Sequence, residues 1–170
     1  MRLRKRANVL FLAASVGFSG LIPRELSADE NAKALVGTWN LTGWTLRVVG
    51  ETEDKEPFGP NPKGRLVMSP EGYWIVIITG ADRHPAKTMD EKIALFDSVL
   101  AYSGKYTIDG EKITIRVDIS GNEVFNGPNQ VQTRFFKLEG DKLVVQTPEI
   151  SSAALPGKKI VGTNIFERAR

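Results

Sequence analysis

The sequence predicts an all-β domain of the sandwich or barrel type, and three observations support this. From Val36 onward, strand-like segments alternate with turn signals about every 8 to 12 residues, a spacing typical of antiparallel sandwiches and barrels. Three connections (residues 69–72, 109–111 and 140–141) are tight and carry the Gly or Asp that hairpin turns require. The segment Ile113–Ile119 alternates apolar with polar residues, which indicates one buried and one solvated face.

Eight segments are predicted to be strands. They cover residues 37–49, 64–68, 73–78, 104–108, 112–119, 130–139, 142–147 and 158–167. The residues before them, 29–35, are interpreted as a short polar lead. The third segment, Tyr-Trp-Ile-Val-Ile-Ile at 73–78, does not alternate, so we expect both of its faces to be covered.

One helix is predicted, between strands three and four. Thr88-Met-Asp-Glu91 has the spacing of a capping box. Ile93, Phe96 and Leu100 then follow at intervals that place them on one helix face. We therefore expect a helix of about three turns over residues 90–100, with its apolar face covering the strand at 73–78.

The first 28 residues resemble an export signal. Residues 1–6 are strongly basic, residues 9–22 are mainly apolar, and Leu26-Ser-Ala28 is a small-residue cleavage site. The apolar run is shorter than the roughly 20 residues of a spanning helix, although an uncleaved anchor remains the alternative. The prediction is a signal peptide over residues 1–28, cleavage after Ala28, and one periplasmic or secreted domain over residues 29–170, with no stable membrane insertion.

Composition narrows the classes of partner. The first 28 residues hold five of the 23 Lys and Arg but one of the 20 Asp and Glu, so the remainder has a net charge near −1 and its charges are interspersed. Nucleic acid and anionic membranes normally require a clustered positive field, and neither is expected as a partner. The chain has no Cys and one His. Disulfides and thiolate sites are excluded, and neither a metal site nor a cofactor is expected.

Six short segments, taken in order, resemble the bacterial and fungal lipocalin-like domain family. The resemblance runs from Leu35 to Arg168 and is carried by residues 35–39, 57–64, 69–73, 81–85, 100–106 and 135–143. It implies an all-β, eight-stranded antiparallel lipocalin-like barrel with one short helix between strands three and four. It also implies a lumen that holds a small organic ligand. Gly37-Thr-Trp39 resembles the Gly-x-Trp opening of lipocalins, and Arg168 is then expected to stack on Trp39 and close the barrel structurally.

The candidate ligand-binding residues are mostly aromatic. They are Arg134, Tyr106, Tyr102, Tyr73, Trp74, His84 and Phe125. Tyr offers an apolar body with a terminal hydroxyl, which suits a partly oxygenated ligand. Arg134 faces the lumen if Phe135 faces outward, and a buried Arg needs an anion. If Phe135 faces inward, Arg134 is a surface charge. We expect Arg134, Tyr106 and His84 to surround one pocket beneath the helix.

His84 is a weak catalytic candidate. It lies in Ala81-Asp-Arg-His-Pro85, where Asp82 would orient the imidazole and Arg83 would hold a carboxylate or enolate. The alternative is a solvated polar loop, because a lone histidine is uninformative without geometry. The segment 57–64, rich in proline, is interpreted as a stiff loop over the barrel mouth.

Three functional hypotheses follow. The first is an exported protein that binds a small, mainly hydrophobic or amphipathic molecule in the barrel lumen, without covalent chemistry. The second is an isomerase, cyclase or hydratase that uses His84 or a lumenal Tyr as acid and base around a substrate held by Arg134. The third is a structural or envelope interaction protein whose barrel is filled with side chains. The sequence leaves the oligomeric state open.

Overall fold

The computed structural model describes residues 28–127, 130–152 and 155–170. Its strands are β1 (Gly37–Val48), β2 (Asp54–Lys55), β3 (Lys63–Met68), β4 (Tyr73–Thr79), β5 (Val99–Asp109), β6 (Lys112–Ser120), β7 (Val131–Glu139), β8 (Lys142–Gln146), β9 (Ile150–Ser151) and β10 (Lys159–Arg168). Its helical segments are α1 (Ala28–Leu35), α2 (Met89–Asp97) and a short 3-10 turn, η1 (Glu123–Phe125).

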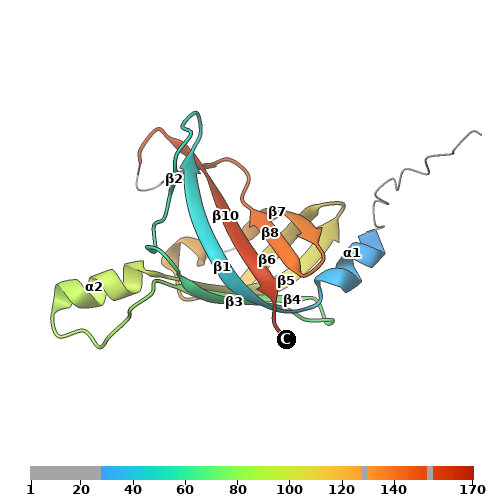
Figure 1. Ribbon diagram of the computed structural model, residues 1–170, viewed down its shortest axis with the longest axis horizontal. Helices are drawn as coiled ribbons and strands as arrows, with labels where there is room; N and C mark the ends of the chain where they lie inside the picture. Colours follow the sequence, from blue (N-terminus) through green and yellow to red (C-terminus); the bar gives the residue numbers. More distant parts are fainter. Residues whose placement is uncertain (1–27, 128–129, 153–154) are drawn as a thin grey trace, which may run out of the picture.

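Eight long antiparallel strands close into a barrel (Figure 1). They follow one another as β1-β3-β4-β5-β6-β7-β8-β10, and β10 pairs back with β1. In the closing pair Trp39 lies opposite Arg168 and Val48 lies opposite Ile160. This confirms the predicted eight-stranded barrel. The two extra strands, β2 and β9, are short additions that pair with β1 and β10 at one end.

Backbone geometry explains how consecutive strands join and where the barrel bends. The three predicted tight turns each contain a glycine with positive φ, at Gly72, Gly110 and Gly140. The β5–β6 register shifts at Ser103/Gly104. A Cβ added at Gly104 would lie 2.1 Å from the Arg116 carbonyl oxygen, so only glycine permits this close approach.

The strand predicted to be covered on both faces is covered on one. In β4 the burial alternates, with Trp74, Val76 and Ile78 in the core and Ile75 and Ile77 on the outer surface. The expectation that a helix covers the outer face is wrong. The apolar run at 73–78 reflects a buried inner face together with an apolar outer face that nothing in the described residues covers.

The predicted helix forms, but it projects from the barrel (Figure 1). α2 has the capping box: Thr88 Oγ1 accepts from the Glu91 amide and the Glu91 carboxylate accepts from the Thr88 amide. None of its residues is buried. The helix ends earlier than predicted, at Asp97. Leu100 belongs to β5, where its partner is Ile78, because cross-strand pairing with β4 outweighs continuation of the helix.

The segment predicted to be a polar lead is a helix. α1 lies at the end of the barrel opposite α2 (Figure 1), and Leu35 at its C-terminus is fully buried in the core. The predicted export signal and its cleavage site lie outside the described residues, apart from Ala28 at the start of α1. Within the described residues, no helix combines the length and the apolar character needed to cross a membrane.

Candidate functional site

One end of the barrel, the floor, is closed by Trp39, Arg168 and α1. The Arg168 guanidinium carbon lies 4.0 Å from the Trp39 ring centroid, and Trp39 is fully buried. Trp39 Nε1 donates to the Leu35 carbonyl at 2.9 Å, and Arg168 donates to the Ala34 and Val36 carbonyls. These bonds satisfy carbonyls that the end of α1 would otherwise leave unpaired. The tryptophan and arginine therefore hold α1 against the floor.

Arg134 lies inside the barrel. Its exposed fraction is 7%, whereas that of the next residue, Phe135, is 45%. The sequence left two orientations open for this strand. In the structure, Phe135 faces outward and Arg134 faces inward. No helix or loop among the described residues buries Phe135. Arg134 thus brings a positive charge into an interior whose buried residues, among those described, are mainly apolar.

Arg134 contacts Tyr102, which in turn contacts Trp74 and Phe125, and we call these four residues the Arg134 cluster. Arg134 Nη2 donates to the Tyr102 hydroxyl at 3.1 Å. The Tyr102 ring stacks with Trp74 at a centroid distance of 6.5 Å and contacts Phe125 at 5.0 Å. The cluster draws its members from β4, β5, β7 and η1. Four segments distant in sequence therefore converge on one interior site.

The cluster presents hydrogen-bond donors. Arg134 Nη1 donates to the Thr133 carbonyl at 2.7 Å and to the Gln132 side chain at 3.4 Å. Among the described residues, Arg134 forms no ion pair with a carboxylate. Burial raises the pKa of Tyr102, and the nearby Arg134 guanidinium and the Trp74 indole N–H that faces the Tyr102 oxygen oppose that rise only in part. Because Tyr102 stays protonated and already accepts from Arg134, its own O–H remains available to donate.

Two further polar atoms are buried without a hydrogen-bond partner in the described part of the chain. They are Nε1 of Trp74 and Oδ1 of Asn164. Trp74 is a member of the cluster, and Asn164 belongs to β10, opposite Trp44 of β1. Buried polar groups in native proteins are nearly always paired with protein or with ordered water. Within the described residues, Trp74 Nε1 is therefore a donor, and Asn164 Oδ1 an acceptor, that water or a bound polar group can pair.

The opposite end of the barrel, the mouth, carries an aromatic contact between a loop and a strand. Phe58, in the predicted loop 57–64, packs edge-on against Trp44 with ring centroids 4.1 Å apart. Both residues contact the core cluster and both are partly buried. Pro62 in the same loop is buried. The proline-rich loop thus lies over the mouth, and its phenylalanine contacts the barrel wall near Asn164.

His84 lies outside the barrel. It lines an open groove of about 260 Å³ together with Phe58, Leu95 and Glu91. Its ring is exposed, and Nδ1 lies 3.3 Å from the backbone carbonyl of Asp82 rather than from the Asp82 carboxylate. Arg83 holds no free anion site either. Its Nη1 donates to the Leu95 carbonyl and to the Ser98 carbonyl and hydroxyl, so Arg83 caps α2.

The structure does not bring Arg134, Tyr106 and His84 together. Tyr106 faces inward but near the floor, where its hydroxyl donates to the Ser69 carbonyl at 3.2 Å. Tyr73 faces outward, and the Lys105 ammonium lies 3.5 Å from its ring centroid. Of the predicted ligand-binding residues, Arg134, Tyr102, Trp74 and Phe125 form one site, whereas Tyr106, Tyr73 and His84 lie apart from it. His84 therefore lies in a solvated polar loop, which was the alternative to a catalytic role.

Sequence reasoning missed Asn164, although a signal was present. In β10 every second residue faces inward, namely Ile160, Gly162, Asn164 and Phe166. The pairing of Arg168 with Trp39 sets which of the two alternating sets this is. An Asn at an inward position among apolar residues is a buried polar group, which calls for a partner. No group of three or more metal-ligating side chains occurs among the described residues.

Comparison with known families agrees with this architecture. A family model described as the lipocalin-like domain matches residues 36–169, which is most of the chain and the whole closed barrel. The chain belongs to the lipocalin-like domain family. No curated protein matches the chain. Membership in this family supports small-molecule binding in general, while the ligand has to be argued from the chemistry of the Arg134 cluster.

Proposed function

We propose that this lipocalin-like protein is exported and binds a small organic molecule in the barrel interior, with an acidic or carbonyl oxygen of the ligand at Arg134. The observation that carries the proposal is a guanidinium that is 7% exposed and has no carboxylate partner among the described residues. Burying an unpaired charge is costly. A ligand oxygen at this position supplies the missing acceptor.

The chemistry of the site selects the ligand. Arg134, the free Tyr102 O–H and Trp74 Nε1 are all donors, so they favour a group with two or more acceptor lone pairs, such as a carboxylate or a conjugated carbonyl. The rest of the interior is apolar and favours a hydrophobic body. Asn164 Oδ1, the one unpaired acceptor among the described buried side chains, suits a hydroxyl or amide N–H elsewhere on the ligand.

Binding without covalent chemistry is favoured over the enzyme hypothesis by where the titratable groups lie. An acid–base mechanism needs a group whose pKa lies near the working pH and within hydrogen-bond reach of the substrate. The raised pKa of Tyr102 makes that residue a poor base. His84 is exposed on a loop and makes no contact with the Arg134 cluster. These features favour a site that binds a ligand oxygen through hydrogen bonds over a site that transfers a proton to or from a substrate.

The export part of the proposal rests on residues 1–28, whose basic, apolar and small-residue regions follow the order of a signal peptide. The absence of Cys from the chain means that folding after export requires no disulfide formation. N-terminal sequencing of the protein from an exporting bacterial host tests this part. A chain that begins at Asp29 in the soluble fraction supports export, and a chain that begins at Met1 in the membrane fraction contradicts it.

Two measurements test ligand binding. Native mass spectrometry of the protein from an exporting host is expected to show a co-purified small molecule. Fluorescence titration with a dansyl-labelled fatty acid and with its methyl ester then tests the role of the charge. We expect the acid to bind more tightly, because only the carboxylate forms an ion pair with Arg134, whereas the ester carbonyl is a neutral acceptor.

Matched arginine variants locate the binding site. Arg134→Leu is expected to weaken binding of the labelled acid about tenfold or more while the ester changes little. Arg47→Leu, which removes an exposed arginine on β1, is the control and should bind both probes like the wild type. Equal affinities of Arg134→Leu and wild type for the acid would contradict the proposed site. Equal binding of acid and ester by the wild type would contradict a carboxylate ligand and leave only a neutral carbonyl oxygen at Arg134.

A further inference from the structure

An apolar groove runs along the outer face of the barrel. It has a volume of about 160 Å³ and lies over β4, β5 and β6. Its large side chains are Ile75, Ile77 and Ile119, and Ile77 and Ile119 are 52% and 69% exposed. Cross-strand pairing aligns Ile75, Ser103 and Ile119 on one row. We call this the outer groove. An exposed apolar surface of this kind commonly marks an interaction site.

A second apolar surface lies on α2. Met89, Ile93 and Phe96 follow at i, i+4 and i+7, so they share one helix face, and each is more than half exposed. We call this the α2 stripe. A helix whose apolar stripe contacts nothing gains no stability from that stripe. The outer groove and the α2 stripe are therefore two unpartnered apolar surfaces on the same chain.

The charges beside the two surfaces are complementary. Along one edge of the α2 stripe lie Asp90 and Asp97, seven residues apart and hence on the same side of the helix, and Lys92 lies along the other edge. Beside the outer groove lie Arg65, paired with Ile77, and Arg116, paired with Lys105, while the exposed Asp118 adjoins Ile119. Asp90, Asp97 and Arg116 form no ion pair within the described residues. An acidic edge and a basic rim favour docking in one orientation.

The connection between α2 and the barrel holds the helix away from its own groove. The Gly80 amide donates to the Ser98 carbonyl at 3.0 Å, and Arg83 donates three hydrogen bonds at the C-terminal end of α2. Folding α2 back onto β4 and β5 would break this arrangement. α2 projects from the barrel (Figure 1), and the three residues of the α2 stripe are each more than half exposed, so the stripe is available to another molecule.

We propose that the protein forms a symmetric dimer in which α2 of each copy docks in the outer groove of the other. Both complementary surfaces belong to one chain, so a two-fold pairing buries both helices and both grooves at once and leaves no open end. Each dimer then contains two copies of the same helix-on-sheet contact. The proposal is independent of the ligand at Arg134.

Charge reversal tests the reciprocal contact. The helix variant is Asp90→Lys with Asp97→Lys, and the groove variant is Arg65→Asp with Arg116→Asp. We expect the wild type to dimerise in sedimentation experiments, and each variant alone to raise the dimer dissociation constant about tenfold or more. Mixing the two variants should restore dimerisation, because each of the two contacts in the mixed dimer again joins opposite charges.

Cysteine variants test whether α2 of the other copy occupies the outer groove. They are usable because the chain has no native Cys. A mixture of Ile77→Cys and Phe96→Cys chains, treated with a short bis-maleimide linker, is expected to form a cross-linked dimer. Ile150→Cys on β9, which is also exposed but outside both surfaces, replaces Ile77→Cys as the control and should not cross-link with Phe96→Cys. A wild type that stays monomeric at about 100 µM overturns the proposal. So does a chain carrying both Ile77→Cys and Phe96→Cys that cross-links only within itself.

Discussion

The two ends of this barrel differ in whether their polar and apolar side chains have partners. At the floor, the polar groups of Trp39 and Arg168 are used: the indole N–H and the guanidinium bond to the carbonyls that end α1. Toward the mouth, Phe58 is only partly buried and α2 carries an unpartnered apolar stripe. Inside the barrel, Trp74 Nε1 and Asn164 Oδ1 lack partners among the described residues.

This difference separates stability from function along one barrel. A closed floor with paired polar groups stabilises the fold, but it leaves no unpaired polar group with which a ligand could form a hydrogen bond. Unpaired donors and exposed apolar side chains cost free energy in the isolated protein and become favourable only when something binds. Variants at the floor should therefore change stability more than binding, and variants toward the mouth should do the reverse.

The largest expected loss of stability is at Trp39. Trp39→Ala removes a fully buried ring and should lower the free energy of unfolding by about 3 to 5 kcal/mol, measured by urea denaturation, without altering ligand preference. Trp44→Ala is the matched control, because Trp44 is partly buried near the mouth. It should cost less stability and change binding of the labelled acid more. Equal melting temperatures for Trp39→Ala and wild type would contradict the role of the floor.

A smaller loss is expected at Arg168. Arg168→Ala removes hydrogen bonds from a charged donor to the carbonyls of Ala34 in α1 and of Val36 just after it, together with the contact with Trp39 and the exposed ion pair with Asp141, a loss of about 1.5 to 3 kcal/mol. Amide hydrogen exchange should show α1 losing protection before the strands do. Arg168→Lys keeps the charge but loses the planar fork, so it should fall between wild type and Ala. Unchanged exchange in α1 would show that the arginine does not hold this helix.

The barrel could be predicted from the sequence, because its signals are local. Gly72, Gly110 and Gly140 mark turns that only a few residue types allow, and the alternation in β6 specifies which face is buried. The capping box of α2 was equally local. The C-terminal end of α2 could not be predicted from local signals, because Val99 can either continue the helix or pair with Thr79. Pairing between segments distant in sequence decides which of the two occurs.

The candidate site was predicted in part. Arg134, Tyr102, Trp74 and Phe125 converge as a group, but the sequence could not show that His84 lies outside the barrel. A residue's position on a long loop depends on where that loop leaves the strand, and Arg83 anchors this loop to α2. Likewise, the apolar residues of β4 indicate that both faces prefer burial, without showing what covers the outer face.

At the mouth, the cap of α2 should affect the helix alone. Thr88→Ala removes the acceptor of the Glu91 amide, which typically costs about 0.5 to 2 kcal/mol. Because no residue of α2 is buried, this cost should appear as faster hydrogen exchange within α2, with little change in the urea midpoint of the barrel. Thr88→Ser retains the acceptor and serves as the control. A fall in global stability as large as that of Arg168→Ala would mean that α2 supports the barrel after all.

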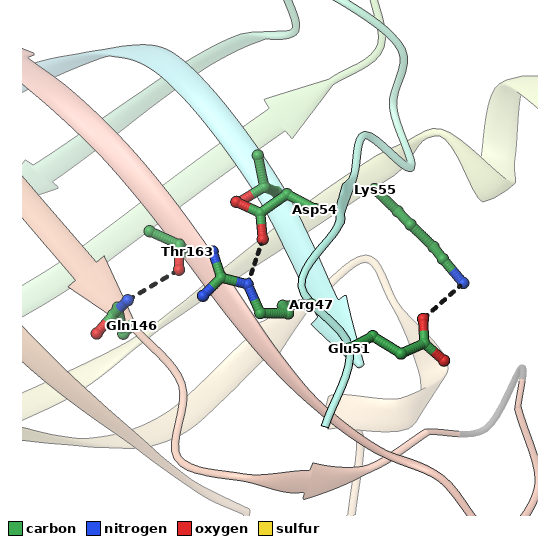
Figure 2. A network of polar contacts seen from close by, with 7 residues as sticks. Arg47, Glu51, Asp54, Lys55, Gln146 and Thr163 are labelled. Carbon is green, nitrogen blue, oxygen red and sulfur yellow. Dashed lines mark hydrogen bonds and ion pairs between the residues drawn. The ribbon is translucent and has the colours of Figure 1, made fainter. Parts of the chain in front are cut away.

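The smallest expected effect concerns the surface network where β2 pairs with β1 (Figure 2). Arg47 Nε donates to Asp54 Oδ1 at 2.6 Å, and this hydrogen bond lowers the pKa of Asp54 from its ordinary value of 3.8. Since the folded-state pKa lies below the unfolded one, the pair stabilises the fold above the unfolded pKa, and this contribution is lost as the pH falls through the folded pKa.

Both side chains of the Arg47–Asp54 pair are exposed to solvent, so the contribution of the pair should be slight and weaker in high salt. NMR titration of the Asp54 carboxyl in Arg47→Gln should give a higher midpoint than in wild type. Gln146→Ala is the control in the same network, because Gln146 donates to Thr163 and not to Asp54 (Figure 2), and it should leave that midpoint unchanged. If Arg47→Gln left the midpoint unchanged as well, the Arg47–Asp54 bond would not persist in solution. β2 would then be held to β1 only by its backbone pairing and the Thr45–Asp54 hydrogen bond, and the mouth would be still less constrained relative to the floor.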